Sequence, residues 1–199
     1  MVARVLASPI DIEERANCPG VHVFGARETT AGVGYGSSST VVNLVVQAHS
    51  GATSEAISYP ACGGQSSCGS VSYANSAKQG VAAVASAVNA YNTQCPTTQL
   101  VLVGYSQVSK LHSTISRRRL TLLQGGQIMD DAYCGGGDST EGITSTAIPI
   151  SAAALKMIKA AIFMGDPRHI AGLSYNVGTC SASGVSLKLC SRAKSLSLS

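Results

Sequence analysis

An apolar run leads directly into Gly104-Tyr105-Ser106, and this junction constrains the fold more than any other feature of the chain. A buried strand that ends at a small residue and a serine is the first half of a nucleophile elbow, which is a tight turn between a strand and a helix. Val108 occupies the position where the Gly-x-Ser-x-Gly pattern requires its second glycine. The glycines follow only at Gly125-Gly126, so omitting residues 108–124 restores a strand, an elbow and a helix.

The half motif fits two roles for Ser106. A serine in an elbow exposes its hydroxyl, and the N-terminus of the following helix favours negative charge that develops there. A serine after a strand can instead cap the helix that follows it. Half of the elbow motif does not distinguish a nucleophile from a helix cap, so both roles remain open for Ser106 at this point.

The composition indicates one domain with an ordinary core. The chain has 199 residues, of which 45% are hydrophobic, and no apolar stretch approaches the roughly 18–20 residues that a membrane span needs. The net charge of +4 comes from two segments, 108–124 and 185–199, that contain basic but no acidic residues. The remainder is acidic overall, so we expect no nucleic-acid partner, and Arg117-Arg118-Arg119 is interpreted as a solvated charge run.

The cysteine pattern indicates disulfides rather than a metal site. No two cysteines form a Cys-x-x-Cys pair and no histidine lies at metal-ligand spacing from them, so we expect neither a metal nor a cofactor. Scattered cysteines in a Gly/Ser-rich chain favour an oxidising compartment and an extracellular location. Residues 1–17 are interpreted as the remnant of a signal peptide and a pro-segment. The seven cysteines are Cys18, Cys62, Cys68, Cys95, Cys134, Cys180 and Cys190.

Apolar runs alternate with segments of helical periodicity along the chain. This alternation predicts an α/β fold, a three-layer α/β/α sandwich around a mostly parallel sheet. The loops after Phe24, Val103 and Met164 are expected to meet, because the carboxyl ends of parallel strands share one edge. Strands are predicted over 21–24, 55–59, 99–104 and 160–164, and helices over 41–46, 75–91, 127–133 and 153–157.

Several separate blocks of sequence resemble fungal acetylxylan esterases of the cutinase-like carbohydrate esterase family. The blocks occur in the family's order and extend over residues 18–184 apart from the segment 108–124, which makes the resemblance specific. They are Cys18-Pro19 with Val21 to Thr30, Gly34 to Ser38, Tyr59 to Gly64, Gly104 to Gln107, Ala160 to Pro167 and Leu173 to Cys180.

The resemblance implies a secreted, monomeric serine esterase with a cutinase-like α/β-hydrolase fold that removes acetyl groups from xylan through an acyl-enzyme. Ser106 matches the nucleophile. Gln107 and Thr29 match the residues that hold the oxyanion, through the backbone N–H of each and the hydroxyl of Thr29. The alternative for Thr29 is a plain loop residue. The resemblance implies no metal, cofactor or membrane. The disulfides that it implies are Cys18–Cys95 and Cys62–Cys68.

The chain departs from the family toward its C-terminus. The family carries its triad Asp and His beyond Thr179-Cys180, where this chain has an unrelated tail, so neither residue is identifiable here. The family's last strand and C-terminal helix lack a counterpart, and the family partner of Cys134 lies in the missing region. A serine without a base is a poor nucleophile, so we expect this chain to be catalytically impaired. The histidines His22, His49, His112 and His169 all stand away from the position of the family's base.

Both atypical segments begin with Val-Ser followed shortly by a lysine. Val-Ser can be encoded by a sequence typical of an intron start, and the closing Gln124 by one typical of an intron end. We therefore hypothesise that residues 108–124 and 185–199 are translated introns, and that the esterase domain is 18–184 interrupted by the first of them. Two other functions remain open: a cutinase acting on polyester lipids, and a non-catalytic polysaccharide-binding or misfolded remnant.

Overall fold

A computed structural model describes residues 18–106, 124–139, 141–177 and 183. Within these ranges, parallel strands form a four-stranded sheet in the order β2-β1-β3-β4. Their carboxyl ends share one edge of the sheet, called the rim below. Residues 1–17, the tail 185–199 and all of the segment 108–124 except Gln124 lie outside the described residues. The strands are β1 (Val21–Ala26), β2 (Thr53–Ala56), β3 (Gln99–Tyr105) and β4 (Ile158–Met164).

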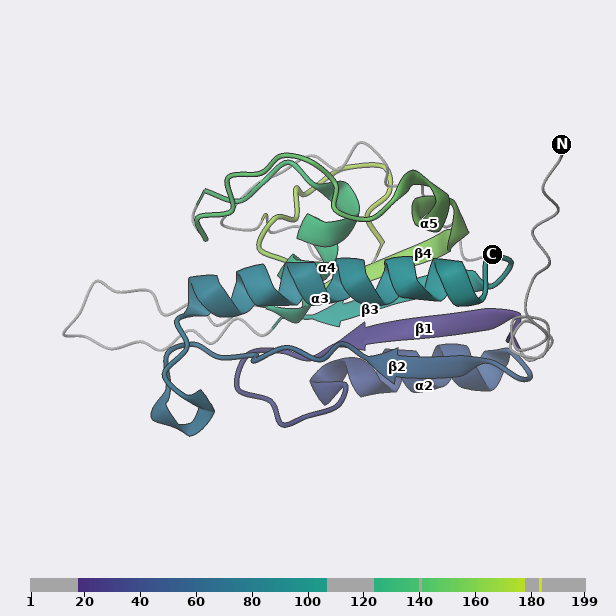
Figure 1. Ribbon diagram of the computed structural model, residues 1–199, viewed down its shortest axis with the longest axis horizontal. Coiled ribbons are helices and arrows are strands. Elements are labelled where there is room, and N and C mark those ends of the chain that lie inside the picture. The colour runs from purple at the N-terminus through teal and green to yellow at the C-terminus, as the bar shows by residue number, and fades with distance from the viewer. Residues whose placement is uncertain (1–17, 107–123, 140, 178–182, 184–199) are drawn as a thin grey trace, which may run out of the picture.

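Helices cover both faces of the sheet and give the molecule three layers (Figure 1). On one face α2 packs on β1 and β2, and on the other face α3, α4 and α5 pack on the sheet and on one another. Two short 3-10 turns, η1 (Gly36–Ser38) and η2 (Ser66–Cys68), lie in the loops that follow β1 and β2. The helices are α2 (Ser39–Ala48), α3 (Tyr73–Gln94), α4 (Gly125–Cys134) and α5 (Ala152–Met157).

The core is divided between the two faces by the alternation of strand side chains, which point to opposite sides with a period of two. Val101 and Val103 of β3 join the smaller cluster under α2. Leu100 and Leu102 of the same strand join the larger cluster under α3 and α4. Gly80 of α3 lets α4 approach closely, because a Cβ at this position would lie 2.8 Å from two carbons of Ile128.

The predicted fold class is confirmed, and each predicted strand and helix is present with shifted ends. Helix α3 begins at Tyr73 rather than Asn75, because the Ser72 side chain accepts a hydrogen bond from the Asn75 N–H and caps the helix. The prediction for β2 was the least accurate, since the strand ends at Ala56 instead of residue 59. The chain turns inward there, and the buried Tyr59 hydroxyl donates to the carbonyl of Arg27 at 2.5 Å.

Both disulfides implied by the resemblance are formed. Cys18 is bonded to Cys95, and Cys62 to Cys68. Cys134 is disulfide-bonded as well, which corrects the expectation that its partner lies in the region missing from this chain. The described helices include none with the length and hydropathy to cross a membrane.

Candidate active site

Ser106 lies at the rim, one residue beyond the end of β3, and is 2% exposed. Its backbone N–H donates to the carbonyl of Met164 at 2.8 Å, which extends the pairing between β3 and β4. Its hydroxyl oxygen accepts hydrogen bonds from the N–H groups of Gly126 at 2.9 Å and Gln127 at 3.4 Å. The first turn of α4 therefore faces Ser106, although residues 107–123 separate the two in the sequence.

Glycines make this approach possible. A Cβ on Gly104 would lie 2.3 Å from the carbonyl oxygen of Gly125, and a Cβ on Gly126 would lie 2.9 Å from the hydroxyl oxygen of Ser106. A Cβ on Gly125 would meet the carbonyl oxygens of Tyr105, Ala26 and Arg27, all within 2.6 Å. The glycines that the elbow pattern lacks in sequence therefore occupy the corresponding place in space, as the sequence predicts when residues 108–124 are omitted.

The first turn of α4 is a favourable place for negative charge on the Ser106 oxygen. Backbone N–H groups at a helix start have no partner within the helix, and the helix dipole adds positive potential there. The same hydrogen bonds satisfy the capping alternative, because Gln124 at the N-cap position makes no side-chain cap bond and Ser106 accepts from the helix in its place. The geometry thus serves both roles that the sequence leaves open for Ser106.

Thr29 lies in the loop after β1 and is 3% exposed. Its hydroxyl is buried and has no hydrogen-bond partner in the structure, which leaves a donor available inside the protein. Hydrogen bonds on both sides of Thr29 fix the loop. The Thr30 N–H donates to the carbonyl of Ala61 at 2.7 Å. The Arg27 guanidinium donates to the carbonyls of Ile57 and Tyr59. A buried unsatisfied hydroxyl is costly, so its presence at the rim is typical of a site that binds a polar group.

Gln107 lies outside the described residues, whereas Gln124 directly precedes the glycines at the start of α4 and is 0% exposed. Sequence reasoning missed Gln124 as a site residue. The signal was present, because a glutamine stands at each end of the segment, and omitting residues 107–123 restores the same Gly-Tyr-Ser-Gln-Gly-Gly string. In the structure Gln124 occupies the N-cap position of α4, directly before Gly125.

The described histidines occupy both ends of the sheet. His22 lies near the start of β1, opposite the rim, where its Nδ1 is 2.7 Å from the Thr53 hydroxyl and its ring stacks on Tyr91. Burial lowers the pKa of His22 to about 4, which fits the core role expected for it. His49 caps the C-terminus of α2, and His169 follows β4 at the rim, where its N–H donates to the carbonyl of Asp166. His112 lies outside the described residues.

A buried arginine joins α4 to the segment that follows β4. The guanidinium of Arg168 forms ion pairs with Asp130, at 3.0 Å, and with Asp131, and it donates to the carbonyl of Gly135 at 2.7 Å. Desolvation by burial raises the pKa of Asp131 to about 7, against the opposing effect of Arg168. Desolvation by burial likewise raises the pKa of Asp130 and the pKa of Asp166. Among the described residues, no three His, Cys, Asp or Glu side chains are arranged to hold a metal ion.

The sheet is parallel, and Ser106 lies at the carboxyl end of the inner strand β3 against the N-terminus of α4. This arrangement defines the fold of a cutinase-like α/β hydrolase. A model of the cutinase family matches residues 17–118, and the chain belongs to this family.

Known relatives and solved structures agree with this assignment. Cutinase 11 of Verticillium dahliae is 58% identical over 184 residues, which are 92% of this chain and 57% of the relative. Acetylxylan esterase 2 of Talaromyces purpureogenus is 59% identical over 179 residues, which are 89% of this chain and 69% of the relative. The catalytic core domain of acetyl xylan esterase from Trichoderma reesei has a TM-score of 0.77 at 57% identity, covering 89% of this chain and 80% of that chain. The chain thus spans little more than half the length of the first relative.

Proposed function

We propose that this chain derives from a secreted serine esterase that removes acetyl groups from acetylated xylan. The observation that carries the proposal is the Ser106 hydroxyl, held at the rim against two N–H groups of α4. Two of the relatives named above, one of them a solved structure, are described as acetylxylan esterases, which supports an acetylated polysaccharide as the substrate. The disulfides fit an oxidising extracellular compartment. A monomer without metal, cofactor, membrane or nucleic-acid partner completes the proposal.

In the proposed reaction, the Ser106 oxygen attacks the acetyl carbonyl and the sugar hydroxyl leaves, which gives an acetyl-enzyme that water then hydrolyses. Thr29 donates its N–H and its hydroxyl to the oxyanion, and its buried, unpartnered hydroxyl supports this role. A glutamine N–H is the further donor. Gln107 is the residue proposed for this role, by its position directly after Ser106 in the sequence.

The proposal includes an impaired reaction in this chain. No residue of this chain matches the family's triad His, which would remove the proton from Ser106, or the triad Asp, which would orient that His. Loss of a triad member costs several orders of magnitude in kcat, while the oxyanion donors and substrate binding retain a residual rate of about 10³–10⁴ over water. We therefore expect slow, serine-dependent acetate release rather than the rate of an intact esterase.

Acetate release from acetylated xylan tests this function. The measurement compares the unaltered chain with Ser106→Ala and with Ser86→Ala, a control serine on the exposed face of α3. Serine-dependent hydrolysis predicts loss of acetate release in Ser106→Ala alone. Equal rates in all three proteins would remove Ser106 from the mechanism. Binding of xylan without any acetate release would favour the non-catalytic remnant.

A cutinase acting on polyester lipids is the second candidate. Two aliphatic side chains in the loops that leave the rim are exposed, Val33 after β1 at 99% and Val177 after β4 at 72%. Exposed aliphatic residues are what a long acyl chain would contact. Rates on nitrophenyl acetate and nitrophenyl palmitate decide between the two: preference for acetate supports the acetylxylan esterase, and preference for palmitate supports the cutinase.

A further inference from the structure

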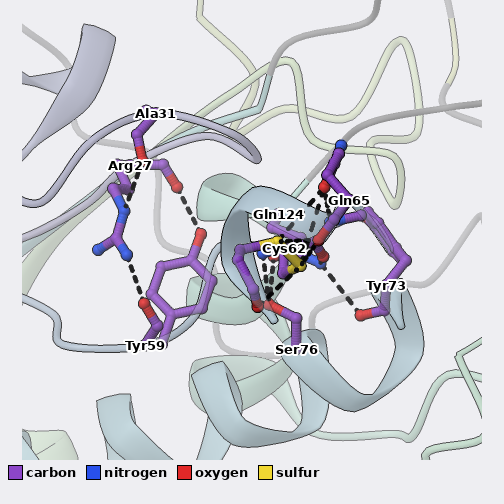
Figure 2. The surroundings of a disulfide bond; sticks show 10 residues. Arg27, Ala31, Tyr59, Cys62, Gln65, Tyr73, Ser76 and Gln124 are labelled. Carbon is purple, nitrogen blue, oxygen red and sulfur yellow. Dashed lines mark hydrogen bonds between the residues drawn. A yellow bond between two sulfur atoms is a disulfide. The ribbon is translucent and has the colours of Figure 1, made fainter. Parts of the chain in front are cut away.

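The side chain of Gln124 has all the hydrogen bonds of a fully anchored amide. Its Nε2 donates to the carbonyl oxygens of Cys62 and Tyr73, each at 3.0 Å. Its Oε1 accepts a hydrogen bond from the hydroxyl of Ser76 at 2.9 Å. Figure 2 shows these groups converging on one amide beside the Cys62–Cys68 disulfide. A buried amide that uses both donor hydrogens and its oxygen is strongly restricted in position.

The anchors of this amide are themselves held in place. Cys62 lies in a short loop that its disulfide with Cys68 closes. Ser76 lies in the first turn of α3, and its hydroxyl also accepts a hydrogen bond from the Cys62 N–H at 2.9 Å. The Ser76 hydroxyl therefore links the disulfide loop to α3 and to Gln124 at the same time.

The chain makes such an anchor necessary. In a continuous elbow, peptide bonds fix the start of the helix relative to the serine. Here residues 107–123 intervene in the sequence, so the position of α4 relative to Ser106 depends on contacts between elements. The hydrogen bonds of the Gly126 and Gln127 N–H groups to Ser106 begin two residues after Gln124.

We propose that Gln124 is a positioning residue: its side-chain amide fastens the start of α4 to the Cys62–Cys68 loop and to α3, and so holds the Gly126 and Gln127 N–H groups on the Ser106 hydroxyl oxygen. The consequence for catalysis rests on the proposed esterase function, whereas the structural coupling does not. A displacement of about 1 Å at a reacting group lowers rates roughly 100-fold. The Gln124 side chain can therefore change the reaction rate at Ser106 through the position of α4, without contacting a substrate.

Gln124→Met tests the proposal, because methionine keeps the length of the side chain and removes every hydrogen bond. The control is Gln79→Met, which makes the same change on the exposed face of α3. Two properties are measured: hydrogen exchange of the Gly126 and Gln127 amides, and the rate of Ser106 acylation by nitrophenyl acetate. In Gln124→Met we expect exchange at both amides to accelerate about 10-fold or more and the acylation rate constant to fall about 10- to 100-fold, with KM changed less than about twofold.

Exchange at Leu102, in the centre of β3, separates local from global effects. Unchanged exchange at Gly126 and Gln127 in Gln124→Met would overturn the proposal, and so would an acceleration of equal size at Leu102. If Gln124→Met does not fold, Ser76→Ala removes one of the three hydrogen bonds and decides instead. We expect about 3- to 10-fold faster exchange at the two amides there, and wild-type exchange would overturn the proposal. If the unaltered chain has no esterase activity, the proposed function fails while the exchange data still decide the role of Gln124.

Discussion

Replacing Gly125 with alanine tests whether the start of α4 packs against the ends of the strands as closely as the structure shows. Gly125 lies where α4 meets β1 and β3, and its backbone conformation is open to any residue, since its φ is not in the left-handed region. The added Cβ would lie 2.4 Å from the carbonyl oxygen of Tyr105, 2.5 Å from that of Ala26 and 2.6 Å from that of Arg27. All three obstacles are backbone atoms, so no side chain can rotate away to relieve the clash.

The size of the effect follows from these distances. An ordinary contact begins at 3.4 Å, so the first turn of α4 must retreat by about 1 Å from the strand ends. Inserting a methyl group into a packed interior typically costs about 1–3 kcal/mol, which for a domain of this size lowers Tm by about 2–12 °C. The same retreat would weaken the hydrogen bonds of the Gly126 and Gln127 N–H groups to Ser106, and we expect the acylation rate to fall roughly 100-fold.

Urea unfolding and the rate of Ser106 acylation measure the two effects. Gly20→Ala is the matched control, because a Cβ at Gly20 would meet nothing within 4 Å. Gly126→Ala separates the two effects, since its closest obstacle is the Ser106 hydroxyl oxygen at 2.9 Å and the next is the Met164 carbonyl at 3.3 Å. We expect Gly126→Ala to lose reactivity with less loss of stability than Gly125→Ala. Stability and reactivity of Gly125→Ala equal to those of Gly20→Ala would refute the close packing.

Three further predictions concern other parts of the molecule. The folded state binds the His22 proton more weakly than the unfolded chain does, so this residue makes the free energy of unfolding rise by about 3 kcal/mol as the pH increases from about 4 to 6.5. Urea unfolding of His22→Phe at several pH values should lack this rise, and a pH dependence identical to that of the unaltered chain would contradict the assignment. Arg168→Met should cost up to about 3–5 kcal/mol above pH 7, where the two buried aspartates are ionised and lose their cation. The cost should fall at lower pH as the aspartates bind protons. A loss no larger than that of the exposed control Lys159→Met would refute this. Spliced transcripts should lack the codons for 108–124 and 185–199, and transcripts that all contain both would end the intron hypothesis.

Much of the fold could be predicted from local patterns. The strands and helices follow from the spacing of apolar residues, and Ser72 caps α3 by an interaction within one turn. The end of β2 could not be predicted in this way, because the chain leaves the sheet to bring the Tyr59 hydroxyl to the Arg27 carbonyl, a contact between distant segments.

The candidate site was predictable in part. Ser106 followed from a strand that ends at Gly-Tyr-Ser, and Thr29 followed from the resemblance to a family. Gln124 was missed because its contacts with Cys62, Tyr73 and Ser76 join segments that are distant in the sequence.

The sequence by itself determined the alternation of strands and helices and the half elbow at Ser106, because these depend on the period of apolar residues and on glycines within a few positions. The tertiary structure alone decided that the Gln124 amide binds the Cys62 loop and α3, that Arg168 joins two aspartates of α4, and that burial lowers the pKa of His22 to about 4. Each of these depends on which groups from distant segments become neighbours and on how far water is excluded from them, and no local pattern contains that information.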